Sequence, residues 1–402
     1  MTAPPSAPPG RVLVVDDNEM NRDMLSRRLR KRGYAVEVVA DGPAALDAVA
    51  GGAVDVVLLD IMMPGMSGYE VLERLKADDG TRHIPVVMVS ALDEMDSVVR
   101  CIKLGAADYL PKPFNATLLR ARVDASLAVK RLHDEERAYT ESLARELEIG
   151  REIQRGFLPE HLPEAPGWDL AARFRPAREV AGDFYDAFWM PGDGGAGGDR
   201  AGAGRLGLVV ADVCDKGVGA ALFMALFRSL IRSTALSTPP GDDAAAVRGT
   251  VRTVSDYIAT THGAANMFAT VFFGVLDVGS GRLVYANGGH EAPAVVAGGR
   301  VRARLGPTGP ALGLLPGLDV GAAEATLAPG EALVVFTDGA TDAQDADGAF
   351  FTEDRLLAIV AEPAPSADDV LARLDAALAA HAGGAAAFDD VTLLAVARHA
   401  PD

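Results

Sequence analysis

Short apolar runs alternate with amphipathic segments along residues 11–125. The runs read RVLVVDD, AVEVV, VDVVLLD, IPVVMVSA and DYLPKP, and a segment with helical spacing of apolar positions follows each of them. Uninterrupted Val/Leu runs are typical of parallel strands that are covered on both faces. Such strand–helix units predict a doubly wound, flavodoxin-like α/β domain with a five-stranded parallel sheet, whose site lies at the carboxyl ends of the strands.

The pattern changes after residue 125 to a long polar stretch with helical spacing, which Pro159 and Pro163 stop. We predict a signalling helix over 126–158. The apolar residues of one heptad seam are Leu132, Tyr139, Leu143, Ile153 and Phe157, whereas Glu136, Glu146 and Gly150 interrupt the same seam. This seam favours a homodimer through 126–157, and a solvated spacer between two domains is the alternative.

Residues 165–399 show a third pattern, in which strand-like runs are separated by Gly and Pro turns. The runs are GLVVADV, FATVFFGVLD, GRLVYANGG, EALVVFTDG and DDVTLLAVAR, with helical patterns at about 217–236, 243–262 and 366–382. We predict a C-terminal α/β sandwich of mostly antiparallel sheets, with a hairpin around DVGSGRL. The glycine-rich stretch 191–204 is expected to be a mobile insertion, and residues 1–10 are expected to be a disordered tail.

Composition and charge argue against several classes of function. Lys and Arg number 38 against 56 Asp and Glu, which gives a net charge of −18. No basic patch offsets this charge, so we expect no nucleic-acid binding. No apolar run approaches the roughly 20 residues of a membrane span, and the first residues lack the pattern of a signal peptide, so we expect a cytoplasmic protein that binds no membrane. Cys101 and Cys214 fit neither a disulfide nor a zinc or thiol-phosphatase motif.

Acidic residues stand at the ends of predicted strands in the N-terminal domain. Asp16 and Asp17 follow the first strand and Asp60 ends the third. The fourth and fifth strands end in Ser90 and Lys112. Neighbouring carboxylates repel one another, so their convergence indicates a bound Mg²⁺. A carboxylate, a metal, a hydroxyl and an ammonium at one sheet edge are the groups that form an acyl phosphate on aspartate.

These residues resemble the response-regulator receiver family over 11–125. The matching motifs are VVDDNEMNRDML, LLDIMMPGMSGYEVL, VVMVSA and DYLPKPF. The resemblance implies that Asp60 accepts a phosphoryl group from an upstream histidine kinase. Ser90 and Lys112 would bind the phosphoryl oxygens, and Tyr109 would report whether the site is phosphorylated. The Mg²⁺ ligands implied by the resemblance are Asp16, Asp17, Asp60 and the carbonyl of Met62.

Four further acidic clusters fall at strand ends in the C-terminal domain. They are Asp183 with Asp186, Asp212, Asp338, and Asp389 with Asp390. A fold that brings them together would explain why so many apolar strands end in carboxylates. Because the ligands would be nearly all oxygen, Mg²⁺ or Mn²⁺ is favoured over zinc. Two such ions bridged by a carboxylate activate water for displacement at phosphorus, which requires no nucleophilic Ser or Cys.

This domain resembles the PP2C-type serine/threonine phosphatases of the SpoIIE/RsbU branch over about 145–399. The matching motifs are VAGDFYD, ADVCDKGVGAAL, MFATVFFGVLD, YANGGHEAP, GPTGPALGLL, FTDGATDA and FDDVTLL. The resemblance implies that Asp212 bridges two Mn²⁺ or Mg²⁺ ions, assisted by the Val213 carbonyl. Asp183 would complete one metal site, and Asp338 and Asp389 the other.

Several residues near these motifs have more than one interpretation. Asp186 and Asp390 are candidates for supporting the metal ligands. Arg178 is a candidate for docking the substrate phosphate, as an arginine does in eukaryotic relatives of this family. Asn287 and His290 either line the site or shape a turn.

The resemblances together predict a two-component response regulator with an enzymatic output. Phosphorylation of Asp60 would control, through 126–157, the dephosphorylation of phosphoserine or phosphothreonine on a protein. By analogy, the substrate would be a STAS-type anti-sigma-factor antagonist. One alternative is a catalytically silent phosphatase-fold scaffold that binds a partner under control of the receiver. The other is a DNA-binding transcription factor, which the acidic charge disfavours.

Overall fold

The computed structural model describes residues 10–400 except 53, 92–94, 192–203 and 386. It divides into two compact units, Met1–Ala144 and Arg145–Asp402, which are described separately. Nearly all of the predicted disordered tail and of the predicted glycine-rich insertion at 191–204 lies outside the described residues.

The first unit is built on a parallel sheet with strand order β2-β1-β3-β4-β5. Its strands are β1 (Arg11–Val15), β2 (Ala35–Val39), β3 (Val56–Asp60), β4 (Val86–Ala91) and β5 (Asp108–Lys112). Its first four helices are α1 (Glu19–Arg30), α2 (Gly42–Ala50), α3 (Gly68–Ala77) and α4 (Met95–Lys103). All five residues of β3 are buried, because separate apolar clusters cover the two faces of the sheet. The predicted doubly wound sheet is confirmed.

Helix α5 runs without interruption from Ala116 to Arg155, over 40 residues. It contains no break at residues 125 and 126, where the change of sequence pattern suggested a boundary, and the two compact units meet within it, after Ala144. Leu132, Tyr139, Leu143 and Ile153 of the predicted seam are between 45% and 72% exposed. The helix therefore presents an exposed apolar stripe in the described part of the chain, and the homodimer stays a prediction.

The second unit contains two five-stranded sheets, with orders β13-β10-β9-β8-β7 and β12-β11-β14-β15-β6, in which neighbouring strands are antiparallel. The first sheet consists of β7 (Phe184–Trp189), β8 (Arg205–Val213), β9 (Ala269–Asp277), β10 (Arg282–Gly288) and β13 (Ala323–Thr326). The second consists of β6 (Trp168–Arg175), β11 (Ala294–Ala297), β12 (Arg300–Arg304), β14 (Ala332–Phe336) and β15 (Val391–Arg398). The predicted hairpin around DVGSGRL is the β9–β10 pair.

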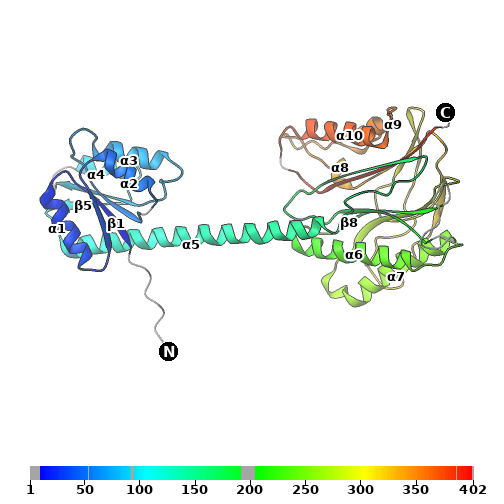
Figure 1. The fold of residues 1–402 in the computed structure, drawn as a ribbon, viewed down its shortest axis with the longest axis horizontal. Coiled ribbons are helices and arrows are strands. Elements are labelled where there is room, and N and C mark those ends of the chain that lie inside the picture. The colour runs from blue at the N-terminus through cyan, green and yellow to red at the C-terminus, as the bar shows by residue number, and fades with distance from the viewer. Residues whose placement is uncertain (1–9, 53, 92–94, 192–203, 386, 401–402) are drawn as a thin grey trace. The chain divides into compact units, whose positions relative to one another are not determined.

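Helices cover the outer faces of these two sheets (Figure 1). The helices are α6 (Val218–Leu236), α7 (Asp243–Thr261), the 3-10 helix η1 (Gly263–Ala265), α8 (Asp338–Thr341), α9 (Glu353–Ala361) and α10 (Ala367–Ala382). Helices α6 and α7 pack on the β7–β10 sheet, and α9 and α10 pack on the β14–β15 sheet. Trp168, Phe272 and Leu394 belong to the core between the sheets. The result is an arrangement of four layers, and the predicted α/β sandwich of mostly antiparallel sheets is confirmed.

Helix α6 is the single helix in the described part of the chain that is long and apolar enough to span a bilayer by length and composition. Core helices pass the same criterion, and α6 buries Met224, Phe227 and Ile231 against the neighbouring sheet. This packing accounts for the apolar residues on the buried face of the helix, whereas Leu222 on another face is 68% exposed.

Candidate functional site

In the first unit, acidic side chains meet where β1 and β3 end. These two strands are neighbours in a parallel sheet, so Asp16 and Asp60 emerge side by side. One carboxylate oxygen from each of Asp16, Asp17 and Asp60 lies within 4.8 Å of the others. The Lys112 ammonium lies 3.0 Å from Asp16 Oδ2 and 2.9 Å from Asp60 Oδ2. Three carboxylates against one ammonium leave excess negative charge, which fits a divalent cation.

The pKa values of Asp60 and Lys112 differ from their ordinary values. Burial raises the pKa of Asp60, although hydrogen bonding and attraction to Lys112 oppose the shift. The pKa of Lys112 is raised, because hydrogen bonds to Asp60 and Asp16 outweigh the effect of burial. Lys112 therefore stays charged and holds both carboxylates.

Side chains from the start of α1 orient Asp16. Its Oδ1 accepts hydrogen bonds from the Asn18 N–H at 2.9 Å and from Asn21 Nδ2 at 3.1 Å. The Arg22 guanidinium donates to the carbonyls of Asp16 and Asp17. The motif VVDDNEMNRDML contained these residues, but no strand pattern marked them as parts of the site.

The other predicted residues of this site lie on the same strands or just after them. Ser90 pairs with Pro111 near the end of β4, and Lys112 is the last residue of β5. Tyr109 is 37% exposed on β5. The Met62 side chain is exposed, and its backbone amide hydrogen-bonds the Asp60 carboxylate. The predicted residues thus come from neighbouring strand ends, and their roles remain proposals.

In the second unit, the predicted carboxylates come from both sheets. Asp183 immediately precedes β7, and Asp212 lies near the end of the neighbouring strand β8. Asp338 begins α8 and is separated from the end of β14 by Thr337 alone. Asp389 and Asp390 directly precede β15, the neighbour of β14. Electrostatic repulsion links Asp212 with Asp338, Asp389 and Asp390, which shows that the two sheets bring these groups together.

Burial and mutual repulsion raise the pKa values of two of these carboxyl groups strongly. Burial, followed by the charges of Asp212 and Asp390, raises the pKa of Asp183 well above its ordinary value. Burial, followed by the charges of Asp338 and Asp389, raises the pKa of Asp212 to about 7. The negative charges around both carboxyl groups are therefore not balanced by nearby positive charges. An all-oxygen set in this condition fits Mg²⁺ or Mn²⁺.

These carboxylates are spaced more widely than those of the first unit. Within the described ranges, the cluster of Asp16, Asp17 and Asp60 is the one group of three potential ligands with all ligand atoms within 4.8 Å.

Neighbouring polar groups fix the buried carboxylates. Thr337 Oγ1 donates to Asp183 Oδ2 at 2.8 Å and accepts from the Thr392 N–H at 2.9 Å. Asp390 accepts from the N–H groups of Ala177 and Gly182, at 2.7 and 2.8 Å. Its carboxylate therefore ties the loop before β7 to the start of β15.

Glycine is required in this loop because two backbone segments come close together. A Cβ atom at Gly182 would lie 2.8 Å from the Val213 carbonyl oxygen, which is closer than real Cβ contacts. The glycine lets the segment that carries Asp183 lie against the end of β8.

Helix α5 contacts the same loop through one buried side chain. Gln154 donates from Nε2 to the Ala181 carbonyl at 2.6 Å and accepts at Oε1 from the Ala181 N–H at 2.9 Å. Ala181 lies two residues before Asp183. The long helix therefore has a two-point contact with the segment that positions a candidate metal ligand, and sequence reasoning missed it.

The remaining candidates take different positions. Asp186 is buried and forms ion pairs with Arg228 and Arg232 of α6, so its carboxylate is already neutralised. Arg178 is exposed on the loop before β7. His290 is buried, its Nδ1 is 3.0 Å from Thr270 Oγ1, and burial lowers its pKa to about 3. Its backbone N–H donates to Asn287 Oδ1 within the turn, and Thr270 is in register with Asp212 of β8, so both predicted roles of this neutral histidine stay open.

We expect the metal-free protein to lose stability as the pH rises between about 4 and about 7. The pKa of Asp212 increases from 3.8 to about 7 in the folded state, so the folded state binds more protons than the unfolded state across that window. Urea unfolding in EDTA, followed at several pH values, measures the slope. Asp212→Asn is expected to make the slope shallower, and an identical slope in the variant would contradict this assignment.

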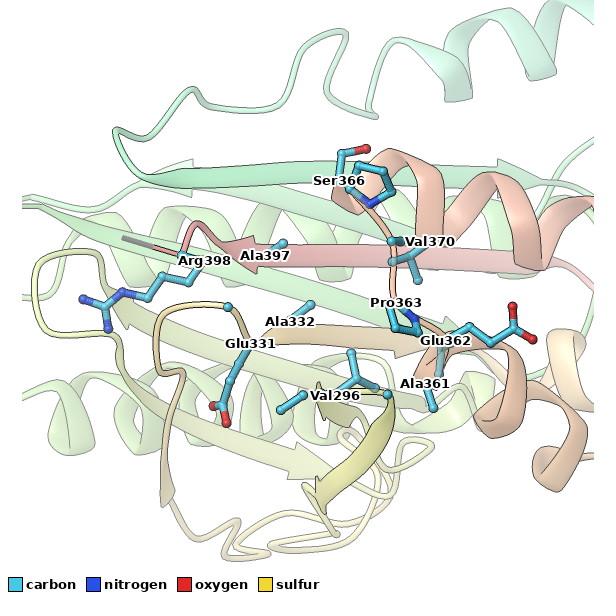
Figure 2. A pocket seen from close by; sticks show the side chains of 18 of the residues that line it. Val296, Glu331, Ala332, Ala361, Glu362, Pro363, Ser366, Val370, Ala397 and Arg398 are labelled. Carbon is cyan, nitrogen blue, oxygen red and sulfur yellow. The ribbon is translucent and has the colours of Figure 1, made fainter. Parts of the chain in front are cut away.

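A cavity of about 280 Å³ lies elsewhere in the second unit (Figure 2). Glu331 and Ala332 at the start of β14, Ala397 and Arg398 at the end of β15, and Pro363 after α9 are among its lining residues. The candidate carboxylates lie beyond the opposite ends of β14 and β15. The cavity is therefore separate from the candidate site.

Comparisons with known proteins agree with both halves of the chain. Residues 12–124 match the response regulator receiver domain model, and residues 202–399 match the model of stage II sporulation protein E, SpoIIE. Protein IcfG of Synechocystis sp. is 40% identical over 274 residues, which are 63% of this chain and 42% of that protein. The sensory transduction protein RegX3 of Mycobacterium tuberculosis is 48% identical over 117 residues, which are 29% of this chain and 50% of that protein.

The chain spans half or less of the length of these curated relatives. Among solved structures, the SiaA-PP2C domain of Pseudomonas aeruginosa aligns with a TM-score of 0.51 at 22% identity, over 64% of this chain and 98% of that one. This likeness concerns the fold alone. The chain therefore joins a segment that matches the response regulator receiver domain to a segment that matches SpoIIE, and its second unit has the fold of a PP2C domain.

Proposed function

We propose that this chain is a response regulator whose output is metal-dependent dephosphorylation of phosphoserine or phosphothreonine on a protein. The observation that carries the proposal is the convergence of Asp183, Asp212, Asp338 and Asp389 from two sheets. Three of these carboxyl groups, Asp183, Asp212 and Asp338, have pKa values raised by burial and by repulsion from neighbouring carboxylates, and cations would relieve both effects.

Asp212 would bridge two Mn²⁺ or Mg²⁺ ions, with the Val213 carbonyl assisting. Asp183 would serve one site, and Asp338 and Asp389 the other. When bound, such ions supply an activated water and neutralise charge that develops on the phosphate. Thr337 and Asp390 hold the ligands in place, and Arg178 is the candidate for docking the phosphate. This chemistry needs no protein nucleophile.

In the first unit, Asp60 would receive a phosphoryl group from a histidine kinase, with Mg²⁺ held by Asp16, Asp17, Asp60 itself and the Met62 carbonyl. Lys112 is already within ion-pair distance of Asp60, and its charge would pair with the phosphoryl oxygens. Ser90 would add a hydrogen bond, and Tyr109 would change its exposure with occupancy.

We infer that α5 carries the signal within a homodimer. Its exposed apolar stripe would pack against the same stripe of a second copy, since residues at heptad spacing on two identical helices can interlock. Sedimentation analysis at micromolar concentration tests this inference. A chain that sediments as a monomer would contradict the homodimer.

The proposed substrate is a phosphorylated STAS-type anti-sigma-factor antagonist, on the strength of the sequence resemblance. Phosphate release from such a protein that requires Mn²⁺ or Mg²⁺ and stops in EDTA would support the proposal. Binding of the same protein without any phosphate release would indicate a catalytically silent scaffold instead.

Gln154→Ala is expected to reduce the effect of the receiver on turnover. The substitution removes both hydrogen bonds to Ala181, so the helix would no longer hold the segment before Asp183. We expect the ratio of turnover with and without beryllofluoride to fall toward one. Gln154→Glu keeps the acceptor and should retain part of that ratio. An unchanged ratio in Gln154→Ala would exclude a role in coupling.

A further inference from the structure

A lysine lies inside the acidic cluster of the second unit. The loop between β8 and α6 turns back at Asp215 and Gly217, which have φ values of +73° and +90°. This turn brings the Lys216 ammonium to 2.9 Å from Asp389 Oδ2 and 2.8 Å from the Phe388 carbonyl oxygen. The ammonium also lies 4.8 Å from the centroid of the Phe388 ring.

These contacts distinguish Lys216 from an ordinary surface ion pair. The side chains of Lys216 and Asp389 are only 31% and 29% exposed. The ammonium binds a carboxylate, a carbonyl and a ring face together, so it is held at three points. An exposed pair with a single contact would be worth little.

The charge of Lys216 also reaches Asp338. Burial, followed by the charges of Asp389 and Asp342, raises the pKa of Asp338, and the Lys216 ammonium counteracts that rise. Lys216 thus acts on the two carboxylates, Asp338 and Asp389, that would serve the same cation.

We propose that Lys216 is a built-in competitor for one of the two cations: its ammonium holds Asp389 and must leave before a divalent ion can bind there. This inference rests on the proposed function, because it takes Asp338 and Asp389 as ligands of one ion. The ion at Asp338 and Asp389 then binds more weakly than the ion at Asp183 and Asp212, since only the weaker site must displace a lysine. The occupancy of this site would set how much of the protein is active at a given cation concentration.

The test is a Mn²⁺ titration of the full-length chain by calorimetry. All samples carry Asp16→Asn, which weakens Mn²⁺ binding at the receiver site. On this background we expect the second unit to show two classes of Mn²⁺ site, one tighter than the other. Lys216→Met keeps the length of the side chain without its charge, and should tighten the weaker class by about tenfold or more. Lys216→Arg keeps the charge and should leave that class weak.

A matched control separates displacement from general electrostatics. Arg178→Met removes one positive charge from the neighbouring loop, where the side chain is exposed, and should tighten binding by less than about twofold. A second readout is thermal unfolding, in which Mn²⁺ should raise the melting temperature more in Lys216→Met than in the unaltered protein.

The outcomes distinguish this inference from the proposed function. If Lys216→Met leaves the Mn²⁺ affinity of the weaker site unchanged or lowers it, the inference is wrong. The proposal of a two-cation phosphatase would still stand. Equal tightening by Lys216→Met and Arg178→Met would also overturn the inference, because the effect would then be one of charge alone. If the unaltered second unit binds no Mn²⁺, the proposed function fails as well.

Discussion

Asp212→Asn should lower the rate of phosphate release by about a thousandfold or more. Asp212 lies between the two sheets, and Asp338, Asp389 and Asp390 all contribute to its raised pKa. Replacing its carboxylate with a neutral amide removes the group that we propose bridges two cations. Contributions of metal ions to catalysis are worth several kcal/mol, which corresponds to roughly this loss of rate. The measurement is turnover of a phosphoserine protein at saturating Mn²⁺.

Stability gives an independent check on this variant. The substitution removes one of several repelling carboxylates, so the free energy of unfolding of the metal-free protein at neutral pH should not fall. Loss of activity together with unfolding would say nothing specific about the site. A variant that keeps more than about a tenth of the activity would contradict the assignment of Asp212.

Asp186→Asn provides the matched control in the same segment. Asp186 is also a buried aspartate, only three residues after Asp183, but it is paired with Arg228 and Arg232. Its replacement leaves two arginines without their partner, so stability should fall. Turnover of the folded fraction should stay within about tenfold of the unaltered protein, because the ion pairs lie outside the cluster.

Asp60→Asn should abolish the response of the phosphatase to beryllofluoride. Beryllofluoride mimics a phosphoryl group on a carboxylate, and Asp60 is buried beside Lys112, 2.9 Å from its ammonium. In the unaltered chain we expect turnover to change by about fivefold or more, the range typical of coupling between two sites. The amide cannot form the adduct, so the variant's turnover should be the same with and without beryllofluoride.

Asp79→Asn is the control for this experiment. Asp79 is exposed in the same unit and forms an ion pair with the exposed Arg82, so its loss should leave the response unchanged. If the Asp60→Asn variant still responds to beryllofluoride, the assignment of Asp60 as the phosphoryl acceptor is wrong.

The first unit was predictable from sequence because a parallel sheet constrains its strand ends. Once β1 and β3 are recognised as buried parallel strands, Asp16 and Asp60 must emerge at the same edge. The second unit was predictable as a fold, yet its strands β6, β7, β11, β12 and β13 were not. Strands β11, β12 and β13 contain only four or five residues each, too few for a period of two to stand out. Strands β6 and β7 contain eight and six residues and were missed all the same.

Contacts between distant segments could not be predicted in the same way. Thr337 and Gln154 reach partners 154 and 27 residues away, and nothing in their own segments distinguishes them from other polar positions. Asp186 did carry a signal: Arg228 and Arg232 are four residues apart on α6, where they share one face of the helix and meet a single carboxylate. The uninterrupted α5 likewise follows from the absence of a breaker near residue 125.

The most direct test of the central claim is phosphate release from a phosphoserine STAS-type protein by the full-length chain, measured in Mn²⁺ with and without beryllofluoride. We expect turnover that disappears in EDTA and in Asp212→Asn, and that changes when beryllofluoride is added. Turnover that needs no divalent cation, or the absence of turnover in both states while Mn²⁺ is bound, would contradict a receiver-controlled, metal-dependent phosphatase.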